Sequence, residues 1–144
     1  MALTKRVKIY TESFIEELSD NGAAEDAEKT FSEAEGELSF FGESILLSYA
    51  ENSADTQMNS KITVSKNGVT VKKSGSANYE FVFIEGGRTE ALYSVPPYSF
   101  DTEIYTRRIR NSLSLDGGEI SLIYDMTIGG AKRKTAMKIR VTML

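Results

Sequence analysis

The chain has 144 residues, the size of a single domain, with 40% hydrophobic residues, 26% charged residues and a formal net charge of −4. This composition excludes wholesale disorder, and no apolar run is long enough to cross a bilayer as a helix. Histidine and cysteine are absent, so the commonest general base and the best transition-metal ligands are missing. We therefore expect one cytoplasmic domain over residues 1–144, with no catalytic residue, metal or cofactor.

Near the N-terminus, basic residues alternate with Val7 and Ile9, which is typical of a strand and not of a signal peptide. The next segment, residues 12–28, departs from this alternation because Phe14 and Leu18 have helical spacing. Two alternatives fit it equally well. It is either one short helix or an elaborated hairpin loop that leads to the next strand.

That next strand lies around Leu38. Apolar and small residues on one face alternate with Glu33, Glu35 and Glu37 on the other, which is the pattern of a half-buried strand with a solvated acidic face. The acidic row could in principle supply a carboxylate pair or bind a hard cation. Like charges on an exposed strand face are ordinarily just solvated, so we assign no catalytic or metal site to it.

The central part of the chain contains the clearest turn signals. Two alternating runs, residues 62–64 and 69–71, are joined through Lys66-Asn67-Gly68, and Asn-Gly between such runs predicts a β-hairpin. After residues 81–84, Gly86-Gly87 predicts another turn. Pro96-Pro97 ends the following strand, because proline cannot donate to a ladder.

Alternation continues through residues 100–104, 120–128 and 137–143, with glycine pairs between the last runs. About eight to ten short antiparallel strands must close into a barrel or stack as two sheets to protect their edges. We predict an all-β fold, a single antiparallel up-and-down barrel. A barrel of about eight strands has room for side chains or for one small ligand.

A set of residues in the second half of the chain resembles the YwiB-like family of small bacterial proteins, which form a domain of unknown function. The resemblance rests on the order and spacing of Ser74-Gly75, Asn78, Phe81, Phe83, Gly86, Tyr93, Pro96, Phe100, Thr106, Gly117-Gly118 and Tyr124. It covers residues 58–128 well and residues 1–57 only by strand pattern. It implies a calycin-like, or lipocalin-like, β-barrel but no activity. The family has a Thr-Pro-Tyr-Gly type turn after Tyr93, whereas this chain has Ser-Val-Pro-Pro-Tyr-Ser at residues 94–99, so any site lined by that turn is altered.

Tyrosines are concentrated in the second half of the chain, and each offers apolar area with one polar group. Together with an amide and a guanidinium they predict a ligand site at a barrel mouth, for a mostly apolar ligand with a polar or anionic end. The residues of this predicted site are Asn78, Tyr79, Arg88, Tyr93, Tyr98, Tyr105 and Tyr124. The alternative is that the same rings only pack the core and rim.

Residues 79–84 are apolar on both faces, with Phe81 and Phe83 on one and Val82 and Ile84 on the other. A barrel has one interior, so the second apolar face needs a cover. Either the segment around Phe14 covers it or a second copy does. We therefore predict Val82 and Ile84 as interface residues of a homodimer.

Two alternatives for function follow, one a non-enzymatic barrel that binds a small apolar ligand and the other a filled barrel that acts through self-association or a protein partner. Nucleic acid is not an expected partner, because the chain is acidic overall and lacks the motifs of single-strand binders. Packing of the interior separates the two alternatives, since a residual pocket of several hundred cubic ångströms favours the ligand. The residues expected inside are Phe81, Phe83, Phe100, Ile104, Leu122, Tyr124 and Met126.

Overall fold

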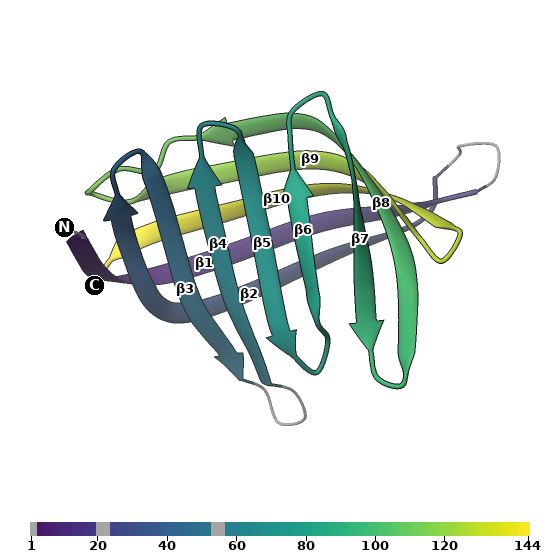
Figure 1. Ribbon diagram of the computed structural model, residues 1–144, viewed down its shortest axis with the longest axis horizontal. Helices are drawn as coiled ribbons and strands as arrows, with labels where there is room; N and C mark the ends of the chain where they lie inside the picture. Colours follow the sequence, from purple (N-terminus) through teal and green to yellow (C-terminus); the bar gives the residue numbers. More distant parts are fainter. Residues whose placement is uncertain (1–2, 20–23, 53–56) are drawn as a thin grey trace.

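A computed structural model gives the structure of the protein and describes residues 3–19, 24–52 and 57–144. In these residues the chain forms ten strands and no helix (Figure 1). The strands are β1 (Leu3–Leu18), β2 (Ala24–Phe41), β3 (Ser44–Asn52), β4 (Gln57–Ser65), β5 (Gly68–Gly75), β6 (Tyr79–Phe83), β7 (Arg88–Val95), β8 (Tyr98–Asn111), β9 (Gly118–Ile128) and β10 (Ala131–Met143).

The strands form one antiparallel sheet in the order β6-β5-β4-β3-β2-β1-β10-β9-β8-β7. Strands that are neighbours in the sequence are neighbours in the sheet, except for β6 and β7, which stand at the two ends of the sheet. In addition, β1 pairs with β10 and so joins the two ends of the chain. The two ends of the sheet, β6 and β7, meet at a seam. There Asn78 N donates to Ser94 O at 2.8 Å and Ser94 N donates to Asn78 O at 2.9 Å. The predicted all-β, up-and-down barrel is confirmed, and it is nearly closed.

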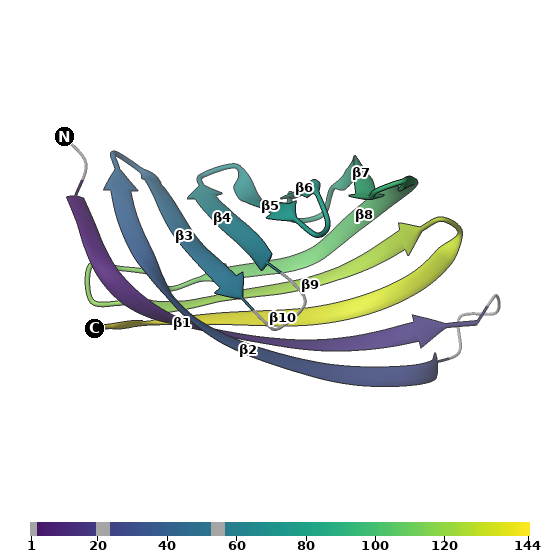
Figure 2. The ribbon, with the colours of Figure 1, turned by 90° about the horizontal axis from the view of Figure 1, so that it is seen from below.

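Two layers of different length enclose the interior (Figure 2). The long strands β1, β2, β9 and β10 form one layer, and the shorter strands β3 to β6 lie across it, while the β7–β8 hairpin closes the remaining side (Figure 1). Alternate residues of both layers point inward and pack against each other. The largest fully buried side chains are Val7, Ile9, Leu38, Leu47, Ile62, Val69, Phe83, Ile104, Ile120, Leu122, Ile139 and Val141.

The segment 12–28 is neither a helix nor an elaborated loop where it is described. β1 continues to Leu18 and β2 begins at Ala24, and the two pair along their whole shared length. β1 also pairs with β10 on its other side, so residue Phe14 lies opposite both Lys29 and Ala136. Two ladders of backbone hydrogen bonds outweigh the weak helical spacing of its apolar residues. Residues 20–23 of this segment lie outside the described residues.

The predicted turns are confirmed. β4 and β5 form the expected hairpin, with Ser65 opposite Gly68 and the turn at Lys66 and Asn67. Pro96 and Pro97 separate β7 from β8. The acidic row of β2 lies on the outer face, where Glu33 pairs with Lys8 and Glu35 with Arg6 from β1. It is thus a solvated and partly neutralised face, as expected.

β2 curls from the long layer into the short one (Figure 2). Gly36 is the first residue of β2 that pairs with β3. This glycine faces Val7 on one side and Tyr49 on the other. A Cβ atom here would collide with the Ser48 carbonyl oxygen and would lie 2.7 Å from the Tyr49 Cβ. The absence of a side chain therefore permits the close approach of β3 that turns the sheet into a barrel.

We predict that Gly36→Ala lowers the free energy of unfolding by about 1–3 kcal/mol, because the added methyl group overpacks a backbone contact. Urea unfolding measures this change. The matched control is Gly87→Ala, where the nearest atom to the new Cβ is the Ile84 carbonyl oxygen at 3.2 Å. A Gly36→Ala loss no larger than that of the control contradicts this role of Gly36.

Candidate functional site

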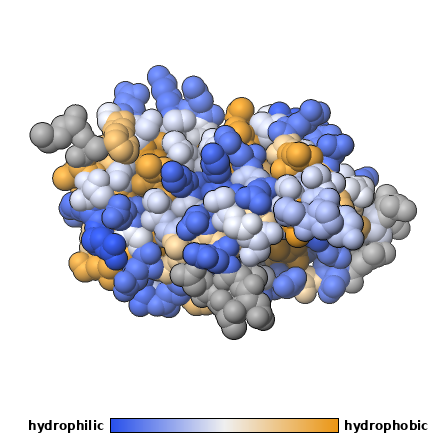
Figure 3. Space-filling view, turned by 60° about the horizontal axis from the view of Figure 1, so that its bottom comes forward, coloured by the Kyte–Doolittle hydropathy of each residue, from blue (hydrophilic) through white to orange (hydrophobic). Residues whose placement is uncertain are grey.

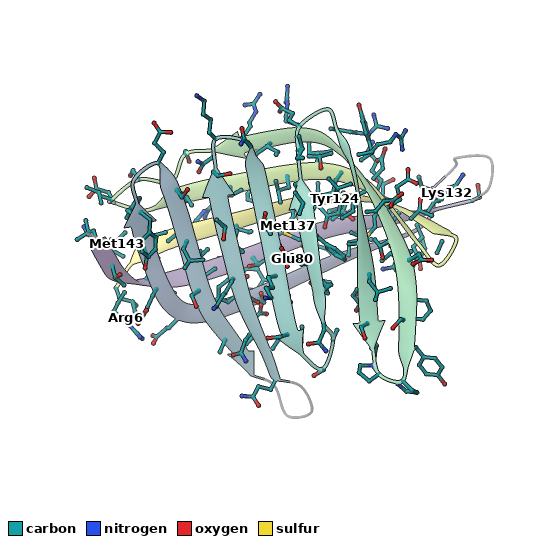
Figure 4. All side chains as sticks on the ribbon, viewed as in Figure 1. Arg6, Glu80, Tyr124, Lys132, Met137 and Met143 are labelled. Atoms are coloured by element: carbon teal, nitrogen blue, oxygen red, sulfur yellow. The ribbon has the colours of Figure 1, made fainter. Side chains whose placement is uncertain are left out.

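The interior of the barrel is not filled. Two cavities of about 260 Å³ and 500 Å³ lie between the layers, toward the end where the long strands extend past the short ones. Tyr124 and Met137 project into this space from β9 and β10 (Figure 4). The two cavities share the lining residues Ser13, Lys73, Tyr79, Phe81, Tyr124 and Met137. Because so much of the lining is common, we treat them as one site.

A larger hollow of about 920 Å³ lies outside the barrel, between the β7–β8 hairpin and the β9–β10 turn. It is a broad, open groove with a mixed lining that includes Glu90, Asp101 and Glu103. Ligand sites in general are enclosed and mostly apolar. The interior cavity fits that description better, so we take it as the candidate site.

β6 supplies much of the aromatic wall. Its alternate residues point inward, and the Tyr79 ring stacks on Phe81 with centroids 4.2 Å apart. The Tyr93 ring of β7 stacks on the other side of the seam, 5.3 Å from Tyr79. Deeper in the barrel, Phe83 lies 4.6 Å from Tyr124. These offset rings form a rigid apolar surface on which a flat or apolar ligand can pack.

Two phenol groups in the wall, those of Tyr79 and Tyr124, stay protonated near neutral pH. Burial raises the pKa of Tyr124 to about 12, although the Thr135 side chain partly offsets the effect by hydrogen bonding. Burial also raises the pKa of Tyr79 far above its usual value, and the nearby Tyr124 and Tyr93 add to the rise. These groups therefore offer neutral hydroxyls for hydrogen bonding, and they are poor general bases near neutral pH.

A strip of hydroxyl groups continues from this wall. The Tyr49 hydroxyl lies beside the side chains of Thr11 and Ser60, although neither of those two oxygens has a partner in good hydrogen-bond geometry. Burial raises the pKa of Tyr49, and the charge of Glu51 raises it further. The smaller cavity thus has a polar side with unused hydrogen-bonding capacity next to its aromatic side.

Two cations stand at the rim. Lys73 Nζ lies 3.5 Å from Glu51 Oε1, and an Arg133 terminal nitrogen lies 3.4 Å from Glu17 Oε1. The Nε atom of Arg133 is buried and has no hydrogen-bond partner. A buried donor without an acceptor is costly, and a ligand oxygen would satisfy it. Among the described residues, no group of three or more acidic side chains is placed to hold a metal ion.

The structure brings together three of the seven predicted site residues, Tyr79, Tyr93 and Tyr124, all of which line the 500 Å³ cavity. Phe100, predicted to fill the interior, instead lies at the rim of the same cavity and is 39% exposed. The reason is its position opposite Tyr93, near the end of the β7–β8 hairpin, where the two layers diverge.

The other four predicted residues lie outside the cavity, and the prediction of one shared mouth is corrected on this point. Asn78 closes the β5–β6 turn, where its side chain exchanges hydrogen bonds with the Gly75 backbone. Arg88 pairs with Glu103 at 2.8 Å and lies over the Tyr105 ring on the outer face. Tyr98 is 66% exposed beside the Pro-Pro turn. Each of the four either occupies a strand position whose side chain points outward or lies at a turn, so its side chain does not enter the barrel.

Val82 and Ile84 do face outward, on the side of β6 opposite the two phenylalanines. Val82 is half-buried, and its carbonyl oxygen accepts a hydrogen bond from Thr89 Oγ1 across the seam. Ile84 is 43% exposed. Their role as interface residues remains a prediction.

Sequence reasoning missed Lys73, Arg133 and Met137, which now line the cavity. Strand phase was the signal that could have found them. Lys73 has the same phase as the buried Val71, while Arg133 and Met137 have the same phase as the buried Ile139. Arg133 stands between Lys132 and Lys134, and this run of three basic residues conceals the alternation.

The fold and its interior site define a class of small β-barrel proteins. Residues 15–140 match the family model described as a domain of unknown function, DUF1934, so the chain belongs to this family. The predicted resemblance to YwiB-like proteins is thereby confirmed. Among the described residues, no helix has the length and apolar character that a membrane crossing requires.

Two comparisons identify a relative. The uncharacterized β-barrel protein YwiB of Bacillus subtilis (strain 168) is 29% identical over 85 residues, a segment that spans 59% of this chain and 60% of YwiB. The crystal structure of YwiB protein from Bacillus subtilis matches with a TM-score of 0.80 over 98% of this chain and 93% of that chain, at 23% identity. This likeness shows the fold.

Burial of the Tyr124 hydroxyl predicts a loss of stability at high pH. The folded pKa of about 12 lies above the ordinary value of 10.0. The neutral Tyr124 hydroxyl therefore contributes fully to the free energy of unfolding below pH 10, and this contribution disappears as the pH rises through 12. Between these values, wild-type stability should fall by about 2 kcal/mol more than that of Tyr124→Phe. Denaturant unfolding at a series of pH values measures the difference. Tyr98→Phe, at an exposed tyrosine, is the control and should lose stability with pH as the wild type does. Wild-type and Tyr124→Phe stabilities that fall in parallel between pH 10 and 12 would contradict the burial argument.

Proposed function

We propose that the protein is a non-enzymatic, cytoplasmic β-barrel that binds a small, largely apolar ligand in the interior cavity. The observation that carries the proposal is the unfilled interior itself. Ligand sites in general measure about 300–1,000 Å³, and the two spaces of about 260 Å³ and 500 Å³, which share six lining residues, fall in that range when taken as one site. A barrel that served only as a packed scaffold would fill this volume with side chains.

The lining indicates the kind of ligand. Aromatic rings and thioethers from Tyr79, Phe81, Met126 and Met137 offer apolar contact to the body of the ligand. The unpartnered Nε of Arg133 offers a hydrogen bond to a polar end at the rim. We infer a molecule with an apolar body and one oxygen-bearing end. The raised pKa values of Tyr79 and Tyr124 support binding in preference to acid–base chemistry.

Isothermal titration calorimetry of the protein with dodecanol and with dodecanoate tests the proposal by measuring the two affinities. The two probes share an apolar body and differ in the polar end. Met137→Trp puts a larger ring into both cavities and should weaken both probes at least tenfold. Arg133→Gln should weaken dodecanoate by about tenfold and dodecanol little, since a charged hydrogen bond contributes about 1.5–3 kcal/mol.

The matched control for Met137→Trp is Leu115→Trp, at a residue that is 46% exposed and lines neither cavity. It should leave both affinities unchanged. Failure of both probes to bind the wild-type protein, or equal binding by Met137→Trp, would rule out the cavity as the site for such ligands.

Exposure of Ile84 on the outer face supports a second candidate function, in which the barrel acts through self-association. In that case the wild type is a dimer in sedimentation velocity experiments, and Ile84→Glu is a monomer because a charge is buried in the contact. Leu92→Glu, at an exposed apolar residue on β7, is the matched control and stays dimeric. A monomeric wild type eliminates this candidate.

A further inference from the structure

The first half of β2 has a sheet edge that no described strand covers. β1 pairs with β2 from Leu18 opposite Ala24 to Leu3 opposite Phe40, whereas β3 pairs only with Gly36–Phe41. Over residues 26–35, the backbone N–H and C=O groups that point away from β1 therefore lack a neighbouring strand within the described structure. Such an edge is a template on which another extended chain can add a strand.

This edge borders the candidate site. Thr30, Phe31 and Ser32 line the smaller cavity together with residues of the opposite layer. Figure 2 shows the first half of β2 as the margin of the long layer, set apart from β3 and β4. Figure 3 brings this side forward and shows apolar surface between hydrophilic groups. A strand added to β2 would lie across the opening and direct alternate side chains toward the cavity.

The charge of the edge selects the partner. Between residues 26 and 35, four carboxylates, those of Asp26, Glu28, Glu33 and Glu35, stand against the one cation Lys29. Glu33 and Glu35 are paired with Lys8 and Arg6 of β1, so the charge left for a partner lies chiefly on Asp26 and Glu28. Lys29 is itself paired with Glu12, and across the opening the cation Lys73 is paired with Glu51. Opposite charges on facing strands stabilise a pair and like charges destabilise it. A partner strand with basic residues fits this edge.

Two further features define the partner. Phe31, in the middle of the edge, is 67% exposed and offers an apolar contact to one side chain of an added strand. A second copy of the chain would present the same acidic strand, so like charges would face each other across such a pair.

We propose that the edge formed by residues 26–35 of β2 binds an extended, basic peptide segment of another protein as an added β-strand. Backbone hydrogen bonds provide the pairing, the carboxylates select basic side chains, and Phe31 contacts an apolar residue between them. The proposal does not depend on the small ligand, because it rests on the sheet edge and its charge.

The probe is a fluorescein-labelled peptide of about eight residues, the length of a strand, in which lysine or arginine alternates with valine or leucine. Fluorescence anisotropy with the full chain should show saturable binding. Two further peptides carry N-methyl groups on the odd or on the even residues, which removes the N–H groups from one edge of the strand. One of these should bind as well as the parent and the other should lose binding at least tenfold.

Protein variants locate the site. Phe31→Ala and the double variant Asp26→Asn, Glu28→Gln should each weaken the basic peptide about threefold to tenfold. Tyr98→Ala, at a ring of similar exposure on a distant turn, should not. Amide hydrogen exchange should slow within residues 27–35 when the peptide binds and should stay unchanged in the β5–β6 turn.

Three results would overturn the proposal. The first is equal binding of a peptide in which glutamate replaces every basic residue. The second is equal binding of both N-methylated peptides, which would show attraction by charge without strand pairing. The third concerns a second copy. The chain has no cysteine, so Phe31→Cys introduces a single thiol, and this variant should stay monomeric under oxidation. Efficient disulfide dimers would show that another copy occupies this edge.

Discussion

The pairing of β1 with β10 is the contact on which the rest of the barrel depends. It joins Val7 to Met143 and continues to Leu18 opposite Lys132, and it is the one strand pair in the described sheet whose members are far apart in sequence. The remaining neighbours are successive hairpins that could each form locally. Closing so long a loop has an entropic cost that local hairpins do not have. The buried Ile9, Ile139 and Val141 near this pair offset that cost by their removal from water.

A mismatch in strand length then produces the features that bear on function. β2 has 18 residues and β1 has 16, but β4 has 9 and β6 has 5. The short strands cover only part of the long layer. The cavity lies between the two layers, its charged rim lies toward the end where the long strands continue past the short ones, and the first half of β2 is left with an open edge. One geometric cause therefore explains both the site for a small ligand and the site for a strand.

Strand phase made most of this fold predictable from the sequence. Alternation placed Phe81 and Phe83 inside and Glu33 outside without any knowledge of the tertiary structure, because a strand has only two faces. The extent of β1 beyond Ser13 was not predictable in this way. There the local spacing of apolar residues suggests a helix, and only the presence of partner strands on both sides decides for a strand.

The candidate site was predictable in part, for a related reason. Tyr79 and Tyr93 could be proposed from residue type, but their meeting across the seam depends on how the two ends of the sheet come together. Arg88 and Tyr105 have the residue types of a binding site and form their own pair on the outside. Residue type suggested what a site needs, while register decided which side chains contribute to it.

The distribution of aromatic residues also gives the protein a spectroscopic property. The chain has no tryptophan, so its intrinsic emission comes from seven tyrosines, four of which, Tyr49, Tyr79, Tyr93 and Tyr124, line the interior cavity. The Tyr79 ring stacks on Phe81 and on Tyr93, and the Tyr124 ring lies against Phe83. Any molecule that enters the barrel changes the environment of most of the chromophores at once. Tyrosine fluorescence and near-ultraviolet circular dichroism therefore report the occupancy of the barrel directly, without a label.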